Sequence, residues 1–387
     1  MPTIARLLEY IEVNPKEVLS KGTVARKISM DKLQPFCRDI PEYELAEFSG
    51  GTKFRNGDTI MARITPCLEN GKTAMVNILA PGEVGFGSTE FIVFRAKAGF
   101  TDPDFVYYLI ISSIVRGPAV KSMVGSSGRQ RVQTDVIQNL EIAFPELSEQ
   151  KKIAGILKAF DDKIALNNKI NENLYEQLTS YYKHLFSAIT PSTSVGELVD
   201  SIFSGGTPST SNEAYWNGDH YWLSSGETSE RFIVSTIKTI TDAGASNSST
   251  RKANKYDIVI ASAGQGHTRG QTSMLLTDTY VNQSIIVVHA APDYLPYLFW
   301  NIANRYEELR VISNSNSIRG SLTTKMIGSL SIPKADITQI RQFSDYAWPI
   351  VKAVENNLHE NRRLAVMRDT LLPQLMSGEL DVSALDL

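Results

Sequence analysis

The chain has 387 residues, of which 42% are hydrophobic and 21% are charged, and its formal net charge is −3. That length exceeds what a single hydrophobic core usually organises, so we expect several structural units in an ordinary globular protein. No run of about 18 apolar residues could cross a bilayer, and the opening stretch MPTIARLLEYIEVNPKE lacks the basic and apolar regions of a signal peptide. We therefore expect a cytoplasmic protein with no membrane partner.

The cysteine and histidine content argues against redox and metal chemistry. Cys37 and Cys67 are the two cysteines of the chain, and its five histidines are scattered along it. Two cysteines cannot build a disulfide framework, and the histidines and cysteines do not have the spacing of a zinc site. We expect no metal and no cofactor in this chain.

The sequence contains two halves with the same order of segments. The first half reads FRNGDTIMARITPCLENGKTAMV, STEFIVFRA, DFVYYLI and GSSGRQRVQTDVIQNLEIAF. The second half reads ANKYDIVIASAGQGHTRGQTSML, NQSIIVVHA, PYLFWNI and SNSIRGSLTTKMIGSLSI. Each half predicts a strand, a polar glycine-rich turn, two strands, a short helix, a polar loop and a strand that ends at Pro145 or Pro333. The shared order indicates duplication followed by divergence.

Each half is followed by a helical segment with a heptad repeat. The repeat residues are spaced alternately by four and three, and the second set follows the first at an offset of 190 residues, as Phe343 follows Ile153. The two sets are Ile153, Leu157, Phe160, Ile164, Asn167, Asn171, Leu174 and Leu178, then Phe343, Ala347, Ile350, Val354, Asn357, Asn361, Leu364 and Arg368. This pattern predicts two helices that wrap around each other, whereas the alternative is that each helix packs on its own domain.

Asparagines in both repeats indicate a defined register. A buried asparagine weakens a coiled coil but disfavours every register in which its amide would face hydrocarbon. In an antiparallel pairing Asn171 meets Asn357, and Asn167 meets Asn361. A parallel pairing would also align the asparagines, so the spacing leaves the direction open, while a twofold duplication favours antiparallel helices. The two lobes would then lie at opposite ends of a rod of roughly 50 Å.

Two residues in the second helical segment depart from a regular apolar pattern. The antiparallel register places Arg368 against Phe160, and we expect the aliphatic part of Arg368 to cover the ring while its guanidinium reaches water. Pro349 removes a backbone hydrogen bond from the helix interior, so we expect a kink there.

Three stretches of the chain resemble the specificity subunits of type I restriction-modification enzymes. SGGTPSTSNEAYWNGDHYWLSSGE, residues 204–227, is similar to the opening of the family's target recognition domains. PELSEQKKIAGILKAFDDKIALNNKINENL, residues 145–174, resembles the central helix of that family. NRRLAVMRDTLLPQLMSGEL, residues 361–380, resembles its distal helix and closing segment.

The resemblance implies an α+β fold with a pseudo-twofold internal repeat. Its parts would be a mixed α/β target recognition domain at 1–147, a central helix at 148–189, a second recognition domain at 190–335, and a distal helix with a C-terminal segment at 336–387. The two long helices would separate the domains as an antiparallel coiled coil. Such a subunit is non-catalytic: each domain reads one part of a split site on double-stranded DNA, and the helices set the spacer and bind two modification subunits.

The same resemblance assigns all chemistry to the partner subunits. The modification subunits would use S-adenosylmethionine to methylate adenine, and restriction subunits, where they accompany the complex, would use ATP. In this chain we expect no catalytic residue.

Base reading requires polar side chains on exposed loops, with arginine matching guanine and asparagine or glutamine matching adenine. Glycine-flanked polar loops supply such side chains at matching points of both halves, although any one of them can equally serve only to connect strands. The candidates are Arg63, Thr65, Asn70, Lys72, Ser126, Ser127, Arg129, Gln130 and Arg131 in the first half, and Gln265, His267, Thr268, Arg269, Gln271, Ser317 and Arg319 in the second.

Two other interpretations compete with DNA reading. The net charge of −3 suits a scaffold whose coiled coil joins two protein-binding domains without nucleic acid, because DNA phosphates attract basic surfaces. The string PCLENGKT, residues 66–73, ends like the phosphate-binding loop of an NTPase, with Lys72 and Thr73 as its functional residues. Pro66 stands where that loop requires glycine, which argues against a nucleotide site.

Overall fold

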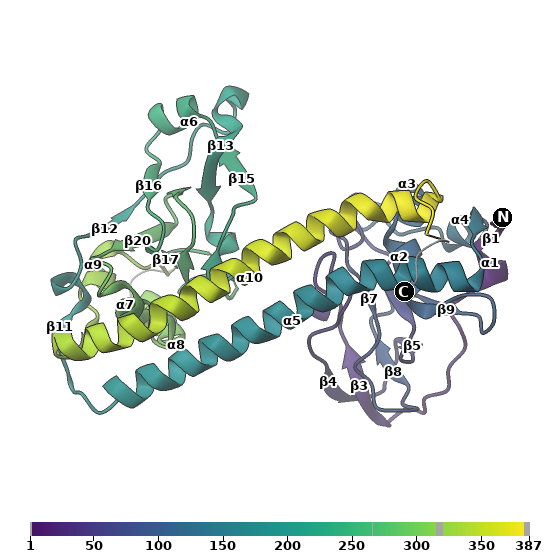
Figure 1. Ribbon diagram of the computed structural model, residues 1–387, viewed down its shortest axis with the longest axis horizontal. Helices are drawn as coiled ribbons and strands as arrows, with labels where there is room; N and C mark the ends of the chain where they lie inside the picture. The colour runs from purple at the N-terminus through teal and green to yellow at the C-terminus, as the bar shows by residue number, and fades with distance from the viewer. Residues whose placement is uncertain (1, 265, 315–319, 383–387) are drawn as a thin grey trace. The chain divides into compact units, whose positions relative to one another are not determined.

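The computed structural model describes residues 2–264, 266–314 and 320–382. The chain divides into two compact units, of which one comprises Met1–Leu166 with Asn361–Leu387 and the other comprises Asn167–Glu360. Each unit contains one mixed α/β domain together with part of two long helices (Figure 1). None of the helices in the described ranges combines the length and the apolar composition that a membrane crossing requires.

The first domain is built from short strands and four short helices within the described residues. Its strands are β1 (Thr3–Arg6), β2 (Ile11–Val13), β3 (Val24–Ile28), β4 (Glu44–Glu47), β5 (Thr52–Phe54), β6 (Thr59–Ala62), β7 (Thr73–Met75), β8 (Gly85–Gly87), β9 (Phe91–Ala96) and β10 (Glu141–Phe144). Its helices are α1 (Leu7–Tyr10), α2 (Pro103–Ile111), α3 (Ser113–Lys121) and α4 (Thr134–Gln138). The strands form sheets in the orders β2-β9-β6-β7, β4-β3-β8-β5 and β1-β10.

The second domain repeats this arrangement. Its strands are β11 (Pro191–Ser194), β12 (Ser201–Ser204), β13 (Trp216–Leu223), β14 (Phe232–Ile233), β15 (Lys238–Ile240), β16 (Arg251–Ala253), β17 (Ile258–Ala261), β18 (Thr272–Leu275), β19 (Thr279–Val281), β20 (Ile285–His289) and β21 (Ser331–Pro333). Its helices are α6 (Asp242–Ser246), α7 (Leu295–Ala303), α8 (Tyr306–Asn314) and α9 (Thr324–Gly328). The sheet orders are β12-β20-β17-β18-β14, β15-β13-β19-β16 and β11-β21.

The sheet orders of the two domains correspond strand by strand, which confirms the internal repeat. The order β2-β9-β6-β7 matches β12-β20-β17-β18, and the second domain adds β14 at the edge. The one parallel pair of the first domain's described sheets, β3 with β8, matches the parallel pair β13 with β19. The remaining pair β1-β10 matches β11-β21, and both are antiparallel.

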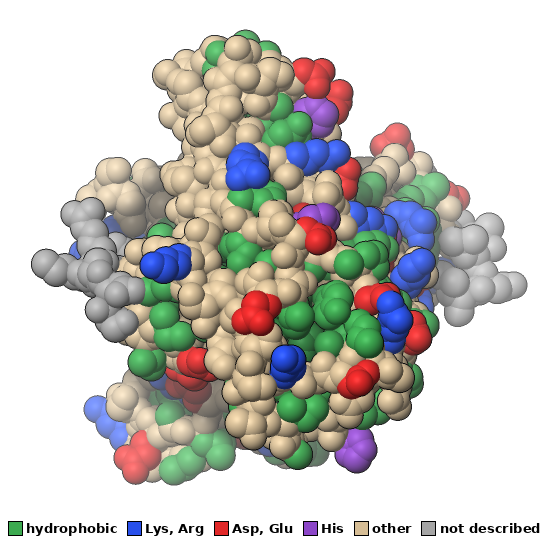
Figure 2. All heavy atoms as spheres, turned by 90° about the vertical axis from the view of Figure 1, so that its left-hand side faces the viewer, with side chains coloured by type: hydrophobic (Ala, Val, Ile, Leu, Met, Phe, Trp, Pro, Cys, Tyr) green, Lys and Arg blue, Asp and Glu red, His purple; other side chains and the backbone are tan. Residues whose placement is uncertain are grey.

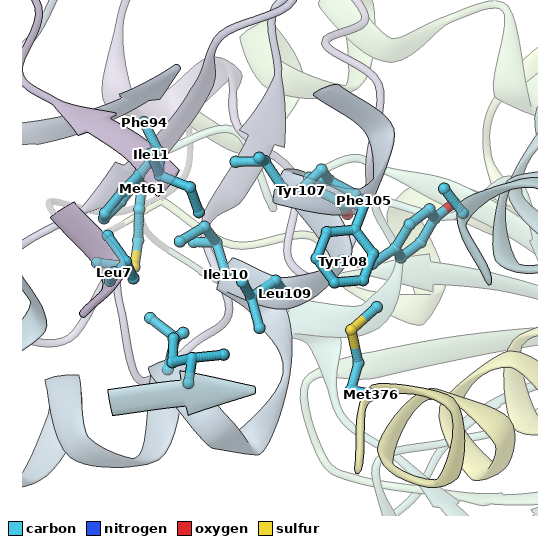
Figure 3. Packing of buried hydrophobic residues seen from close by; sticks show 14 of the residues in the cluster. Leu7, Ile11, Met61, Phe94, Phe105, Tyr107, Tyr108, Leu109, Ile110 and Met376 are labelled. Carbon is cyan, nitrogen blue, oxygen red and sulfur yellow. The ribbon is translucent and has the colours of Figure 1, made fainter. Parts of the chain in front are cut away.

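The core of the first domain forms around α2, in which residues 105–110 are all buried (Figure 3). Asp102 caps this helix by accepting hydrogen bonds from the backbone N–H groups of Asp104 and Phe105, and Pro103 follows it at the first helical position. Met376, from the C-terminal long helix, is buried in the same cluster as Phe105. The helix therefore joins the sheet to the long helices through one continuous apolar core.

The two long helices are α5 (Leu147–Phe186) and α10 (Ile337–Ser377), and they run antiparallel in each unit (Figure 1). In the first unit Asp161 contacts Arg368. In the second unit Asn171 contacts Asn357, and towards the C-terminal end of α5 Tyr181 contacts Gln342, which lies towards the N-terminal end of α10. The structure thus confirms the mutual pairing of the helices and resolves the direction that the spacing had left open.

The surroundings of the Arg368 guanidinium differ from those expected from the register. The Arg368 side chain is only 8% exposed, and its guanidinium donates to the carboxylate of Asp161 instead of reaching water. The partner of Arg368 on α5 is therefore Asp161, the residue after Phe160, and the contact is ionic. The helix α10 also continues unbroken through Pro349, and Phe343 and Val351, on either side of that proline, are buried in the same core.

Candidate nucleic-acid interface

The sequence-predicted DNA-binding residues that the structure describes lie on two loops of the first domain and on one loop of the second. In the first domain, residues 63–72 connect β6 to β7 and are called the first hairpin loop, while residues 122–133 connect α3 to α4 and are called the first helix loop. The equivalents in the second domain are the second hairpin loop, whose described residues are 262–264 and 266–271, and the second helix loop, of which residues 320–323 are described. Gln265, Ser317 and Arg319 lie outside the described residues.

The structure brings the two loops of the first domain together. The backbone N–H of Thr65 donates to the carbonyl oxygen of Gln130 at 3.0 Å, and that of Val132 donates to the carbonyl oxygen of Arg63 at 2.9 Å. The candidates of both loops therefore belong to one surface, although they are about sixty residues apart in the sequence. Asn70, Ser126, Ser127, Arg129 and Arg131 are exposed, whereas Arg63, Thr65, Lys72 and Gln130 are half-buried.

The first helix loop has a tight turn that presents its polar side chains. Val124 and Arg131 exchange backbone hydrogen bonds of 3.0 and 2.9 Å, and the N–H of Arg129 donates to the carbonyl oxygen of Ser126. Gly125 has a φ of +137°, and a Cβ there would lie 3.1 Å from the carbonyl oxygen of Arg129. Glycine at this position thus permits the close approach of the two loop arms, and residues 126–129 form the exposed tip.

Glu90 is a functional candidate that the sequence interpretation missed. Its carboxylate accepts hydrogen bonds from Nε of Arg131, at 3.0 Å to each oxygen, and from Nη2 at 2.7 Å. Nε of Arg63 lies 3.9 Å from the same carboxylate. The hydrogen bonds and the charge of Arg131 hold the pKa of Glu90 below its ordinary value, so the group stays ionised. One carboxylate is therefore shared by the arginines of both loops.

In the second domain the candidates are divided between surface and interior. His267 is exposed and Thr268 and Gln271 are half-buried. Arg269 is only 8% exposed, and its Nη2 donates to the side chain of Asn314 at the end of α8. Arg269 thus supports the second hairpin loop from within.

Helix α8 also holds the second hairpin loop from outside. The hydroxyl of Tyr306 donates to the carbonyl oxygen of His267, and a guanidinium N–H of Arg310 donates to that of Gly266, both at 2.7 Å. These two residues were not predicted, because their role depends on the helix lying against the loop.

The segment that resembles a phosphate-binding loop has the wrong geometry for one. Its backbone N–H groups are used internally, since Asn70 donates to the carbonyl oxygen of Pro66 and Lys72 donates to that of Cys67. The ammonium of Lys72 donates to the carbonyl oxygen of Met30 at 2.9 Å. The segment leads into strand β7, whereas a phosphate-binding loop opens a helix. The arrangement fits a structural turn and leaves no set of amides to surround a phosphate.

Of the two asparagine pairs that the antiparallel register predicts, the structure shows the contact between Asn171 and Asn357. Nδ2 of Asn357 donates to Oδ1 of Asn171 at 2.7 Å. Asn167 is 1% exposed, and its Nδ2 donates to the carboxylate of Glu360 at 2.7 Å. Asn361 is half-buried on α10. The contact between Asn171 and Asn357 agrees with the predicted register residue for residue.

The described residues hold no cluster of metal ligands, and the face around the second domain carries mixed charge (Figure 2). Within these ranges, no three His, Cys, Asp or Glu side chains gather in a way that could hold a metal ion. Figure 2 looks onto the side that carries the second domain, where Lys and Arg side chains are scattered and alternate with acidic ones. Attraction to phosphates on this face would therefore depend on local loop residues or on a partner protein.

Comparison with known proteins gives a consistent result. Residues 28–176 match the family model of the type I restriction modification DNA specificity domain. The chain is 29% identical over 206 residues to the specificity subunit of the EcoAI enzyme from Escherichia coli, a match that covers 50% of this chain but only 34% of that relative. It is 22% identical over 409 residues to the HindI specificity subunit from Haemophilus influenzae, covering 84% of this chain and 87% of the relative.

A solved structure shares the fold. The S subunit of a type I restriction-modification system from M. genitalium aligns with a TM-score of 0.57 at 16% sequence identity, covering 98% of this chain and 96% of the other. At that identity the likeness concerns the arrangement of elements alone.

Proposed function

We propose that the chain is a specificity subunit of a type I restriction-modification enzyme and acts as its non-catalytic, DNA-reading component. Each of its two domains reads one part of a split site on double-stranded DNA through its hairpin loop and helix loop. The helices α5 and α10 set the unread spacer between the two parts. They also carry the docking surface for two modification subunits.

One observation supports this proposal above the others: an equivalent backbone hydrogen bond joins the hairpin loop to the helix loop in both domains, while the side chains of the loops differ. The N–H of Val132 donates to the carbonyl oxygen of Arg63, and at the equivalent place that of Leu322 donates to Ser262, both at 2.9 Å. A constant backbone with variable polar side chains suits a protein that reads two different half-sites.

The chemistry would reside in the partners. S-adenosylmethionine would bind to the modification subunits, which methylate adenine, and ATP would bind to restriction subunits where these join the complex. The 40 residues of α5 correspond to about 60 Å of helix, which is sufficient for a spacer between two sites on one duplex.

A binding experiment with the modification subunit present tests the proposal. Fluorescence anisotropy of a labelled random-sequence duplex should show binding that weakens as salt rises, because phosphate contacts release counterions. The scaffold alternative, which the net charge of −3 favours, predicts no binding to the duplex at any salt concentration. That outcome would remove DNA reading and leave the scaffold.

A further inference from the structure

The turn that precedes the last strand of the main sheet has the same geometry in both domains. In the first domain the N–H of Glu90 donates to the side chain of Ser88 at 3.1 Å, and in the second the N–H of Ser284 donates to the side chain of Asn282 at 3.0 Å. Phe91 and Ile285, the residues that follow, each donate to the backbone oxygen of the turn's first residue. Glu90 and Ser284 are therefore equivalent positions.

The hairpin loop meets this turn in the same way in both domains. The N–H of Arg63 donates to the carbonyl oxygen of Glu90 at 2.9 Å, and that of Ser262 donates to the carbonyl oxygen of Ser284 at 2.8 Å. The backbone is constant, yet an arginine and a glutamate in the first domain are replaced by two serines in the second. Folding alone does not require the ionic group, because the second domain folds in the same way with short neutral side chains.

The carboxylate of Glu90 fixes the orientation of the Arg131 guanidinium. Glu90 occupies the edge of the guanidinium formed by Nε and Nη2, so the edge formed by Nη1 and Nη2 faces away from the carboxylate. The side chain of Arg131 remains 45% exposed, whereas that of Glu90 is 23% exposed. A guanidinium that presents two parallel N–H groups matches O6 and N7 of guanine. A long arginine held at one edge also loses less conformational entropy on binding.

We infer that Glu90 is a specificity-determining positioning residue of the first domain, which orients Arg131 to read a guanine in the half-site of that domain. The inference rests on the proposed DNA-reading function. Glu90 acts on the base through Arg131 and also offsets the charge of Arg63, so it limits attraction to phosphates of any sequence. The second domain, with Ser284 at this position, reads its half-site without such a pair.

Selection from a random duplex library, with the chain in complex with its modification subunit, tests the inference. The wild type should enrich a split site, and Glu90→Ala should lower the preference for one guanine in one half by about tenfold while the other half is unchanged. Glu90→Gln, which keeps the shape of the side chain, should give a smaller loss at the same base. Both variants should bind the unselected library more tightly, because a negative charge is removed.

Two comparisons make the outcome decisive. Arg131→Ala should lose the preference for the same guanine. Adding Glu90→Ala to this variant should not lower that preference further. Glu83→Gln removes the same charge from a glutamate of similar exposure, which pairs with Arg26, and should leave every base preference unchanged. If the wild type enriches no site, the proposed function fails. If it enriches a site and Glu90→Ala retains every base preference, or loses preference in both halves, the role of Glu90 is overturned.

Discussion

Asp161 and Arg368 are 207 residues apart in the sequence, yet they form an ion pair of 2.5 Å in which both side chains are less than a tenth exposed. Asp161 also accepts a hydrogen bond from the hydroxyl of Tyr108 at 2.6 Å. Burial and the negative charge of Asp161 raise the pKa of Tyr108, so the phenol stays protonated and donates. The pair thus joins α5, α10 and the core helix α2 of the first domain.

Replacing Arg368 by methionine should destabilise the protein strongly. The substitution keeps the volume of the side chain but leaves the carboxylate of Asp161 buried with only Tyr108 as a described partner. Removing one member of a buried ion pair costs about 3–5 kcal/mol. Urea denaturation followed by circular dichroism would measure the loss.

A second substitution should rescue that variant. Asp161→Asn is neutral and retains an oxygen for Tyr108, so Asp161→Asn with Arg368→Met should recover most of the lost stability. Lys158→Met is the matched control, because Lys158 pairs with Asp162 on the exposed face of α5 and such pairs contribute about 0.3–0.5 kcal/mol. A loss for Arg368→Met as small as that of the control would show that the buried pair contributes little.

Replacing Asn171 and Asn357 together by leucine should raise the thermal midpoint while loosening the register. Nδ2 of Asn171 is buried and has no hydrogen-bond partner among the described residues, so an apolar layer is more stable than the amide pair. Differential scanning calorimetry would report the midpoint, and amide hydrogen exchange along α5 would report the loss of a single register. Asn357→Leu alone should instead lower the midpoint, because it removes the partner of Asn171. A lower thermal midpoint for the double variant than for the wild type would contradict the claim that the buried amides of this layer destabilise the protein.

Glu83 should contribute stability that depends on pH. Burial alone raises the pKa of Glu83, but backbone N–H groups of Ala80 and Arg26 and the charge of Arg26 hold it below its ordinary value. A depressed pKa in the folded state stabilises the protein at pH values above the unfolded carboxyl pKa, and this contribution is lost as the pH falls through the folded value. Glu83→Gln should therefore be less stable than the wild type at neutral pH, and the difference should shrink in acid. Urea midpoints across a pH series that show a constant difference would be inconsistent with this mechanism.

Arg129 should contact DNA without selecting a sequence, because it lies on the exposed tip of the first helix loop. Arg129→Ala should weaken binding to a random duplex and reduce the slope of log affinity against log salt by about 1. The control is Lys21→Ala, since Lys21 is exposed and precedes strand β3 at the end away from the turn that holds Glu90. Equal salt slopes for Arg129→Ala and the wild type would place this tip away from the phosphates.

Periodic and repeated features of the sequence were enough to predict most of the architecture. The alternation of four and three residues predicted α5 and α10, and the asparagines predicted the register that Asn171 and Asn357 adopt. The duplicated order of strands and loops predicted two domains whose sheets correspond. These predictions succeed because apolar spacing is a local property that each helix and strand expresses directly.

The individual contacts of the loops could not be predicted in the same way. An arginine in a polar loop has the same sequence signature whether it faces outward, as Arg129 does, or inward towards Asn314, as Arg269 does. Glu90 gained its role from side-chain contacts with Arg131 and Arg63, which lie in distant segments of the sequence. The sequence nonetheless contained a signal for it. When STEFIVFRA is aligned with NQSIIVVHA, Glu90 aligns with Ser284, and the apolar strand that follows is shared by both halves.

Methylation sequencing of a host with and without this gene, expressed together with its modification subunit, addresses DNA recognition by the two domains most directly. The proposed function predicts gene-dependent adenine methylation in one split motif, with two defined parts separated by a spacer of fixed length. Exchanging residues 122–133 for the helix loop of another specificity subunit should change one part and leave the other intact. Methylation that does not depend on the gene, or that falls in a single uninterrupted motif, would contradict the reading of two half-sites by two domains.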